Sequence, residues 1–563
     1  MNALIAILLL LFIPAVMSIM RLTRLTTKFL WMAALLGALA SWGLIFAARF
    51  NLPAEIAPQT WQPVSLLPLS PALRVDELSW PMAMALATLL LAVVLTSAAR
   101  LERRGLLPPA PQPALENMPN PVPPAPQTSQ GAYWKAWAAN LALTGLGLVA
   151  VLAGNMLTLL LAWAALDIVE VLILLGQAAT SLERGQVVRA FSARLGGVGA
   201  LLLAGIAAWG QGVQFDFDTS SSLAILFMLA AAGIRLGILP IIAPSLSELP
   251  MRLGLGTILR LVPVASSLVL LVRSSSTGVQ GTAGLVLLGF AALTGLIGGV
   301  GWLRAQDALA GRPYWILAVA SLAMAAAILG QPWACLAWSL VALLPGGLLF
   351  LSSIKRRYML VIGLFGVLSL TGLPFSPAWS GTSLFQMASS TDGLIIRVLT
   401  VLLGLVFFVV HVLLIIGYAN QVLRSSTTPP EEQQAKVDRW VWLLYIPGLA
   451  CLPVIHWVLS WISLRVTAEI PLVMWVEGAV ASAAAVGLLV YTSRAVREKR
   501  PSLAERRWSS SGQIYQPLVQ FLAWFFRQVT LLINVITAML EGEAGILWAF
   551  VLLVLALAFL QQG

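Results

Sequence analysis

Charged side chains are scarce in this sequence. Asp, Glu, Lys and Arg make up 10% of its 563 residues, whereas they make up about 25% of an average soluble domain. Hydrophobic residues make up 60%. So few charges cannot cover the surface of a soluble protein of this length. The composition therefore excludes a soluble globular protein and predicts a polytopic membrane protein.

Cysteine and histidine are also rare, with two residues of each. Cys335 and Cys451 both lie in or beside apolar segments, which argues against a disulfide framework or a thiolate metal site. No Cys/His cluster has metal-ligand spacing, and the sequence has no Gly-x-x-x-x-Gly-Lys phosphate loop. We therefore expect no metal and no cofactor, and a chain that is not a redox enzyme or an ATPase by itself.

Apolar stretches of about 20 residues recur along the whole chain. An α-helix of this length crosses the hydrocarbon core of a bilayer, which is roughly 30 Å thick, so the pattern predicts about sixteen helical spans. The predicted spans are 2–20, 29–48, 78–99, 136–154, 156–177, 187–210, 222–240, 252–272, 283–303, 313–330, 332–352, 358–386, 395–418, 441–464, 470–492 and 544–560.

The basic residues are distributed unequally between the loops on the two sides of the membrane. The even-numbered loops hold only Arg49, Arg74, Arg273, Arg397 and Arg465, whereas the odd-numbered loops hold most of the others, including Arg184, Arg189 and Arg194. This bias predicts a multi-pass protein of an inner (cytoplasmic) membrane, with the N-terminus outside and the odd loops in the cytoplasm. It also accounts for the net charge of +11, so we expect the lipid bilayer, and no nucleic acid, as a partner.

Two regions differ from the apolar spans. Residues 101–134 are rich in proline and are predicted to form an extended cytoplasmic linker, which is either a spacer or a docking strap. Residues 511–541 place their polar side chains on one narrow arc of a helix. This helix either lies along the membrane surface as a lateral helix or crosses the membrane at a tilt.

Prolines interrupt two of the predicted spans. In 358–386, the run from Gly372 to Pro377 contains Pro374 and breaks an otherwise apolar stretch. In 252–272, Pro263 is predicted to cause a second break, although for one helix taken alone a simple proline kink is the better explanation. Non-helical backbone at membrane depth is tolerated only inside protein or beside a water-filled cavity, so two broken helices favour a transporter-like protein.

Five stretches carry a family resemblance, in order and spacing along residues 1–425. They are RVDELSWPMAMALATLLLAVVLTSA (74–98), GNMLTLLLAWAALDIVEVLILLG (154–176), AILFMLAAAGIRLGILPIIAP (224–244), DALAGRPYWILAVASLAMAAAILG (307–330) and SLTGLPFSPAWSG (369–381). Together they resemble the proton-conducting antiporter-like membrane subunits of complex I, membrane-bound hydrogenases, Mrp cation antiporters and related bicarbonate-uptake systems.

The resemblance implies a fold and a domain organisation. The fold is all-α, with about 14 antiporter-like core helices, two of them broken, and C-terminal extension helices. Residues 1–425 are expected to form the antiporter-like transmembrane core and residues 426–492 additional transmembrane helices. Residues 493–563 are expected to contain a basic cytoplasmic segment, the lateral helix and a final transmembrane helix.

Several ionisable residues of that family are missing from this chain. Ala164 follows Trp163 where the family has a glutamate, Arg235 stands at the position of the seventh-helix lysine, and the lysine expected near Asp307 is absent. The five lysines of the chain, Lys28, Lys135, Lys355, Lys436 and Lys499, all lie outside the predicted spans. An arginine stays protonated in proteins, so Arg235 cannot relay protons as a lysine can.

The ionisable groups left at membrane depth are the candidate site residues. A charge inside a membrane is energetically costly, so each such residue is treated as a candidate functional residue. The candidates for an ion path or an intramembrane ion pair are Asp167, Glu170, Arg235, Arg260, His411 and Glu477. Asp167 and Glu170 are three residues apart and share a helix face, so one of them is expected to pair with Arg235.

The roles of these groups stay open at the level of sequence. The carboxylate paired with Arg235 is either part of a fixed structural pair or a proton relay. His411 is either a proton carrier or a residue bonded to a neighbouring helix. Glu477 has the same two possibilities, and Arg260 is expected to bond carbonyls freed near Pro263.

The resemblance also implies a function. It predicts a membrane subunit of an energy-converting respiratory or ion-translocating complex, such as an NADH:quinone oxidoreductase-like complex, with other membrane and peripheral subunits as partners. Because the Lys/Glu set is lost, proton translocation is expected to be impaired or rewired through Asp167, Glu170 and His411. The alternatives are a non-conducting membrane scaffold, or an independent secondary transporter of an anionic solute that uses Arg235 or Arg260 as counter-charge.

Overall fold

The computed structural model describes parts of residues 1–239 and 244–489, which belong to one structural unit. The described residues are 1–22, 30–57, 70–106, 133–178, 180–209, 217, 221–239, 253–279, 281–352, 359–385, 394–426, 441–463, 476, 478–483 and 486–487. The predicted lateral helix at 511–541, the final span at 544–560 and Glu477 lie outside these residues.

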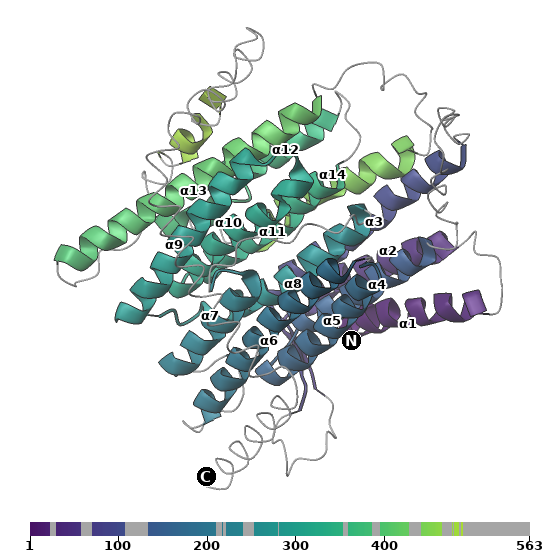
Figure 1. Ribbon diagram of the computed structural model, residues 1–563, viewed down its shortest axis with the longest axis horizontal. Coiled ribbons are helices and arrows are strands. Elements are labelled where there is room, and N and C mark those ends of the chain that lie inside the picture. The colour runs from purple at the N-terminus through teal and green to yellow at the C-terminus, as the bar shows by residue number, and fades with distance from the viewer. Residues whose placement is uncertain are drawn as a thin grey trace. The chain divides into compact units, whose positions relative to one another are not determined.

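The described unit is a bundle of α-helices (Figure 1). The helices are α1 (Asn2–Leu22), α2 (Leu30–Ala48), α3 (Ser79–Leu106), α4 (Tyr133–Val151), α5 (Met156–Leu175), α6 (Ser181–Trp209), α7 (Ser222–Leu236), α8 (Leu253–Ser274), α9 (Gly281–Arg304), α10 (Ala308–Ile328), α11 (Pro332–Leu351), α12 (Met359–Leu370), α13 (Leu394–Ser426) and α14 (Ile446–Ser463). Among the described residues, 12 helices are long and apolar enough to cross a membrane, and α7 and α12 are shorter apolar helices. The predicted all-α polytopic membrane fold is confirmed.

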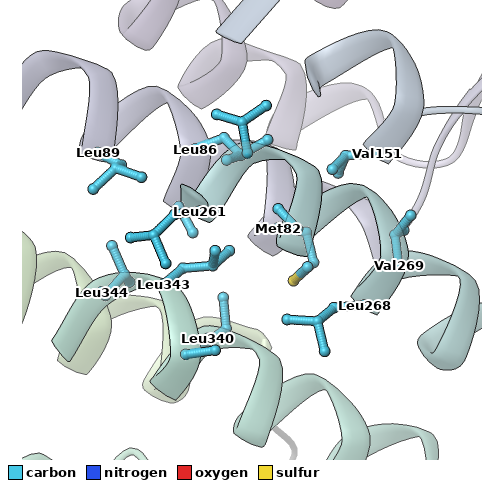
Figure 2. Close-up of a cluster of buried hydrophobic side chains, with 14 of the residues drawn as sticks. Met82, Leu86, Leu89, Val151, Leu261, Leu268, Val269, Leu340, Leu343 and Leu344 are labelled. Atoms are coloured by element: carbon cyan, nitrogen blue, oxygen red, sulfur yellow. The ribbon is translucent and has the colours of Figure 1, made fainter. Parts of the chain in front are cut away.

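The centre of the bundle is formed by α3, α8, α10 and α11. In α11 every residue of the most apolar stretch is buried, whereas in α1 only 28% are. Figure 2 shows leucine, valine and methionine side chains of α3, α4, α8 and α11, such as Met82, Leu261 and Leu343, converging on one another. Because these helices are apolar on all sides, each can be surrounded by other helices, while α1, α6 and α13 keep apolar faces exposed for lipid.

A short antiparallel hairpin follows α2. Its strands, β1 (Ala54–Ile56) and β2 (Leu73–Val75), pair with Glu55 opposite Arg74. β2 also contacts the turn between α4 and α5, where the Gly154 amide donates to the Ala72 carbonyl at 2.7 Å. The hairpin therefore connects the start of α3 to the start of α5.

The interrupted helices of the described unit are α7 and α12. Each ends next to a glycine in the left-handed region, Gly237 with φ 77° and Gly372 with φ 65°. Each also has a proline four residues after its last helical residue, because Pro240 follows Leu236 and Pro374 follows Leu370. After α12 the chain continues into a 3-10 helix, η4 (Trp379–Phe385), instead of completing an α-helical span. The interruption predicted at 358–386 is therefore present.

The break predicted at Pro263 is absent, because α8 is a continuous helix through this residue. Four other helices also continue through prolines, namely Pro14, Pro313, Pro345 and Pro453. A proline removes one backbone donor, and neighbouring helices can stabilise the remaining turns of a membrane helix. Around Pro263 the hydroxyls of Ser266 and Ser267 donate to the Pro263 carbonyl at 2.7 and 3.0 Å. A proline alone therefore does not mark a break in this chain.

The proline-rich segment is shorter than predicted at its N-terminal side. α3 extends to Leu106, so the first residues of the predicted linker 101–134 are helical, and α4 begins at Tyr133. The start of the proline-rich run lies beyond Leu106, and residues 107–132 lie outside the described residues. The arginines at 103 and 104 therefore continue a helix instead of starting an extended segment.

Candidate functional site: a buried ion-pair cluster between α5, α6 and α7

Two carboxylates lie on the inner face of α5. This helix begins at an N-cap, Asn155, whose side chain accepts a hydrogen bond from the Thr158 amide. Asp167 and Glu170 follow three to four turns later, and their separation of three residues places them on the same face. Both are buried, with 1% and 2% of their surface exposed. A buried carboxylate needs a partner of opposite charge, because burial removes its hydration.

Arg235 is the partner of Asp167. Its two terminal nitrogens donate to the two carboxylate oxygens at 2.6 and 2.8 Å, a bidentate arrangement. Arg235 occupies the last turn of α7, which ends where the amides of Gly237 and Ile238 donate back to the Ile234 and Gly233 carbonyls. The interruption of α7 therefore places the guanidinium beside the middle of α5.

Trp163 and Gly197 form the walls around this guanidinium. The guanidinium carbon lies 4.3 Å from the centroid of the Trp163 ring, in cation–π geometry. The Trp163 indole nitrogen donates to the Ser266 carbonyl of α8 at 3.2 Å, which fixes the ring. On the α6 side, a Cβ added at Gly197 would lie 2.5 Å from the Arg235 Cγ. The cluster therefore needs a residue without a side chain at this position of α6.

Arg194 completes the cluster and was missed at the level of sequence. It contacts the Glu170 carboxylate directly, and its guanidinium also lies 3.8 Å from an Asp167 oxygen. The sequence analysis counted Arg194 among the basic residues of a cytoplasmic loop. α6, however, already begins at Ser181, which places Arg194 more than three turns inside the helix. The predicted span 187–210 already contains Arg194, so its place in that span was the available signal; the capping box of Thr180 and Glu183 starts α6 earlier still.

The cluster is electrically balanced. Two guanidinium groups from α6 and α7 face two carboxylates from α5, and each carboxylate has a guanidinium in direct contact. Arginine cannot give up its proton in a protein. The geometry thus links α5, α6 and α7 through side-chain ion pairs.

His411 lies at the second interruption, in the middle of α13. Its ring nitrogen Nε2 is 2.8 Å from the Leu370 carbonyl at the end of α12. The ring contacts Trp338 of α11 and Phe385 of η4 at centroid distances of 5.1 and 5.6 Å. The structure therefore places His411 against the end of α12, α11 and η4, whereas Asp167, Glu170, Arg194 and Arg235 lie on α5, α6 and α7.

The other predicted residues lie elsewhere or are not described. Arg260 is half-buried in α8, three residues before Pro263. Pro374 and Pro377 belong to the interruption after α12. Within the described ranges, no group of three or more His, Cys, Asp or Glu side chains is arranged to hold a metal ion.

A second ion pair, between the buried Arg273 and the half-buried Asp76, lies where β2 meets α3 and α8. Asp76 contacts Arg273, the basic residue in the last turn of α8, and accepts hydrogen bonds from the amides of Leu78 and Ser79. Burial raises the pKa of the Asp76 carboxyl, but the Arg273 charge and the Ser79 hydrogen bonds outweigh burial and hold the pKa below its ordinary value. The sequence analysis assigned both arginines of this region, Arg74 and Arg273, only to loops.

No protein-family profile and no curated protein matches this chain. Solved structures do match it. A chain of the membrane-bound sulfane sulfur reductase (MBS), an archaeal respiratory membrane complex, is 14% identical, with a TM-score of 0.63 over 99% of this chain and 100% of that chain. A chain of the Mrp complex from Dietzia sp. is 15% identical, with a TM-score of 0.61 over 100% of this chain and 63% of that chain. A chain of respiratory complex I from Thermus thermophilus, with bound aureothin, is 18% identical, with a TM-score of 0.50 over 79% of this chain and 97% of that chain.

These likenesses define the fold. The chain has the fold of the polytopic antiporter-like membrane subunits, as its sequence motifs predict, and it diverges strongly from them in sequence. It spans the whole of the matched reductase chain but less than two thirds of the matched Mrp chain. The structural neighbours are membrane subunits of energy-converting complexes and Mrp antiporters.

Proposed function

We propose that this protein is a membrane subunit of an energy-converting, ion-translocating complex, in which the charges of α5, α6 and α7 form a fixed ion-pair cluster instead of a proton relay. The observation that carries the second half of this proposal is the bidentate, buried pair between Asp167 and Arg235. A relay needs a group that gains and loses a proton in the working pH range, and a guanidinium does not.

The ion pair alone would permit a relay through the carboxylates, but their environment argues against it. Asp167 accepts two hydrogen bonds from Arg235 and lies beside Arg194, while Glu170 contacts Arg194. Both oxygens of Asp167 are bound by Arg235, and separating this buried pair would leave a buried charge without its counter-charge, which is strongly unfavourable. Proton translocation through this half of the chain is therefore impaired. The rewired path through Asp167, Glu170 and His411 has less support from the geometry.

Two alternatives follow from the same fold. A non-conducting scaffold would hold partner subunits in the bilayer through its exposed helix faces. An independent transporter of an anionic solute would need an arginine whose guanidinium is available to the solute. Arg235 binds Asp167 through both terminal nitrogens, so the anion-transport alternative receives less support at this residue.

The topology and the C-terminal domains belong to the same proposal. We propose that the N-terminus lies outside, so that the β1–β2 hairpin faces the exterior and the α3–α4 connection faces the cytoplasm of a cell bounded by this membrane. The basic residues of the loops support this orientation. Residues 426–492 and 493–563 are proposed to extend the core with further helices and a basic cytoplasmic segment.

Purification of the full chain from its native membrane in a mild detergent tests membership in a complex. Stoichiometric redox or ion-translocating subunits in the purified material support the proposal and identify the driving reaction. A monodisperse protein without partners contradicts it and favours the solitary transporter. In the assembled complex, neutral replacements Asp167→Asn, Glu170→Gln and His411→Gln together test the rewired path, because unchanged ion translocation would remove that path.

A further inference from the structure

The end of α12 leaves one carbonyl group without a helical partner. In a continuing helix, the Leu370 carbonyl would accept a hydrogen bond from the amide of residue 374. Residue 374 is a proline and has no N–H group. In a membrane, an unsatisfied buried carbonyl is costly because no water is present to replace the lost donor.

The neighbouring carbonyls of this turn find donors close by in the sequence. The Leu368 carbonyl accepts from the Thr371 hydroxyl at 2.9 Å, and the Ser369 carbonyl accepts from the Ala378 amide at 3.1 Å. The Leu370 carbonyl instead has a donor from a different helix, the His411 ring at 2.8 Å. A carbonyl oxygen can only accept, so Nε2 of His411 carries the hydrogen in this bond.

The surroundings hold the imidazole in this position. The Trp338 ring meets it edge-on, and the Phe385 ring stacks on it with an interplanar angle of 20°. The Trp338 indole nitrogen donates to the Gly381 carbonyl of η4 at 3.1 Å. A Cβ added at Gly372 would lie 3.2 Å from the His411 Cε1 and 2.8 Å from the Thr382 methyl carbon. The left-handed glycine therefore allows the imidazole and η4 to approach the broken helix from two sides.

We propose that His411 is a positioning residue that supplies the hydrogen-bond donor that Pro374 lacks, and that it thereby fixes the interruption of α12 between α11, α13 and η4. Nε2 carries a hydrogen both in the imidazolium and in the neutral Nε2–H tautomer that a bond to a carbonyl requires, so this bond does not require His411 to be charged. The inference does not rest on the proposed function, because a conducting and a non-conducting subunit would both need the broken helix to be held.

The hydrogen bonds that end α7 and α12 differ in the distance along the chain that they cross. At the end of α7, backbone amides of Gly237, Ile238 and Leu239 donate to the Gly233 and Ile234 carbonyls within the same chain segment. At the end of α12, the Leu370 carbonyl is bonded to a side chain of α13 across 41 residues of sequence. The bond of His411 therefore joins the end of α12 to a different helix.

Three substitutions of His411 distinguish the contribution of its hydrogen-bond donor from the contribution of the packed ring. Glutamine can place its amide nitrogen at the position of Nε2, whereas asparagine is shorter and reaches only the position of Nδ1. Leucine fills space and has no donor. We would purify the full-length variants in mild detergent and follow amide hydrogen exchange in peptides covering residues 368–385, with thermal unfolding as a second measurement.

We expect the exchange rates of the variants to depend on whether residue 411 keeps a hydrogen-bond donor at the position of Nε2. His411→Gln should exchange like the unmodified protein, while His411→Asn and His411→Leu should exchange about tenfold faster in this segment, the factor expected from the loss of one buried hydrogen bond. His456→Leu is the matched control, since His456 is buried in α14 and neither ring nitrogen has a partner among the described residues. This control should leave exchange in 368–385 unchanged.

Other outcomes would overturn the inference. Equal exchange in the Gln and Leu variants would show that the donor is not what holds the segment, and so would unchanged exchange in all three variants. If the Leu variant does not fold, recovery of a folded protein with Gln but not with Asn supports the inference. Failure of all three variants to fold contradicts it, because rescue by the conservative Gln change is its central requirement.

Discussion

The ion pair between Asp167 and Arg235 gives a prediction that can be worked out in energy. Arg235→Met leaves two carboxylates facing Arg194 alone, and Asp167→Leu leaves two guanidinium groups facing Glu170 alone. Each single change therefore buries one uncompensated charge. The double change Asp167→Leu with Arg235→Met removes one charge of each sign and leaves the neutral pair of Glu170 and Arg194.

The magnitude follows from the burial of both groups. The side chains of Arg235 and Asp167 are 1% and 2% exposed. Two unit charges about 4 Å apart attract one another by about 4 kcal/mol at an effective dielectric constant of about 20. Removing one partner of a buried pair costs about 3–5 kcal/mol, whereas replacing both by apolar residues is close to neutral. The double variant should therefore be more stable than either single variant.

SDS-induced unfolding of the full-length protein in mild detergent measures the unfolding free energy of each variant. We expect each single variant to lose about 3 kcal/mol or more of unfolding free energy and the double variant to lose little, which corresponds to a coupling free energy of about 6 kcal/mol. Additive losses in the double variant would refute a fixed pair, and so would losses below about 1 kcal/mol in both single variants.

Two further predictions concern the walls of the cluster and the second ion pair. Gly197→Ala should destabilise the protein by about 1–3 kcal/mol, since its Cβ would lie 2.5 Å from the Arg235 Cγ. The matched control is Gly199→Ala, because nothing lies within 4 Å of a Cβ at this position. This control should be neutral or stabilising in the same unfolding assay. Because the folded-state pKa of Asp76 is lowered, its pairing with Arg273 stabilises the protein above the ordinary carboxyl pKa of about 3.9, and this contribution is lost as the pH falls through the lowered folded pKa. The thermal unfolding temperature, measured from pH 7 down to pH 3, should therefore fall less steeply in Asp76→Asn than in the unmodified protein. Equal slopes of unfolding temperature against pH would contradict the role of this carboxylate.

Composition and periodicity were sufficient to predict most of the fold. Long apolar stretches predicted the transmembrane helices to within a few residues in most cases, because the thickness of a bilayer sets their length. The prolines were less informative. Pro263 lies within a continuous helix, while α7 and α12 end where a glycine two or three residues before the proline has a positive φ, as Gly372 does before Pro374. The glycine adopts the left-handed conformation that ends the helix. The spacing alone is not sufficient, because Gly311 precedes Pro313 by two residues within the continuous α10.

The candidate site was only partly visible in the sequence. Asp167 and Arg235 stand out because charges are rare in apolar stretches. Arg194 was assigned to a loop, because a basic residue near a helix end gives the same signal as a cytoplasmic flank. The partner of His411 is a backbone carbonyl, which every residue has, so no side-chain pattern could identify it. Contacts of this kind depend on the packing of distant helices.

Ion translocation by the assembled complex, with and without the charges of the Asp167–Arg235 pair, tests the central claim most directly. The variant to compare is Asp167→Asn with Arg235→Gln, which removes both charges and leaves a polar amide at each position. The fixed-pair account predicts that a complex containing this variant assembles and translocates ions at the rate of the unmodified complex. A complex that assembles normally but loses translocation would contradict the account and show that the pair is part of the ion path.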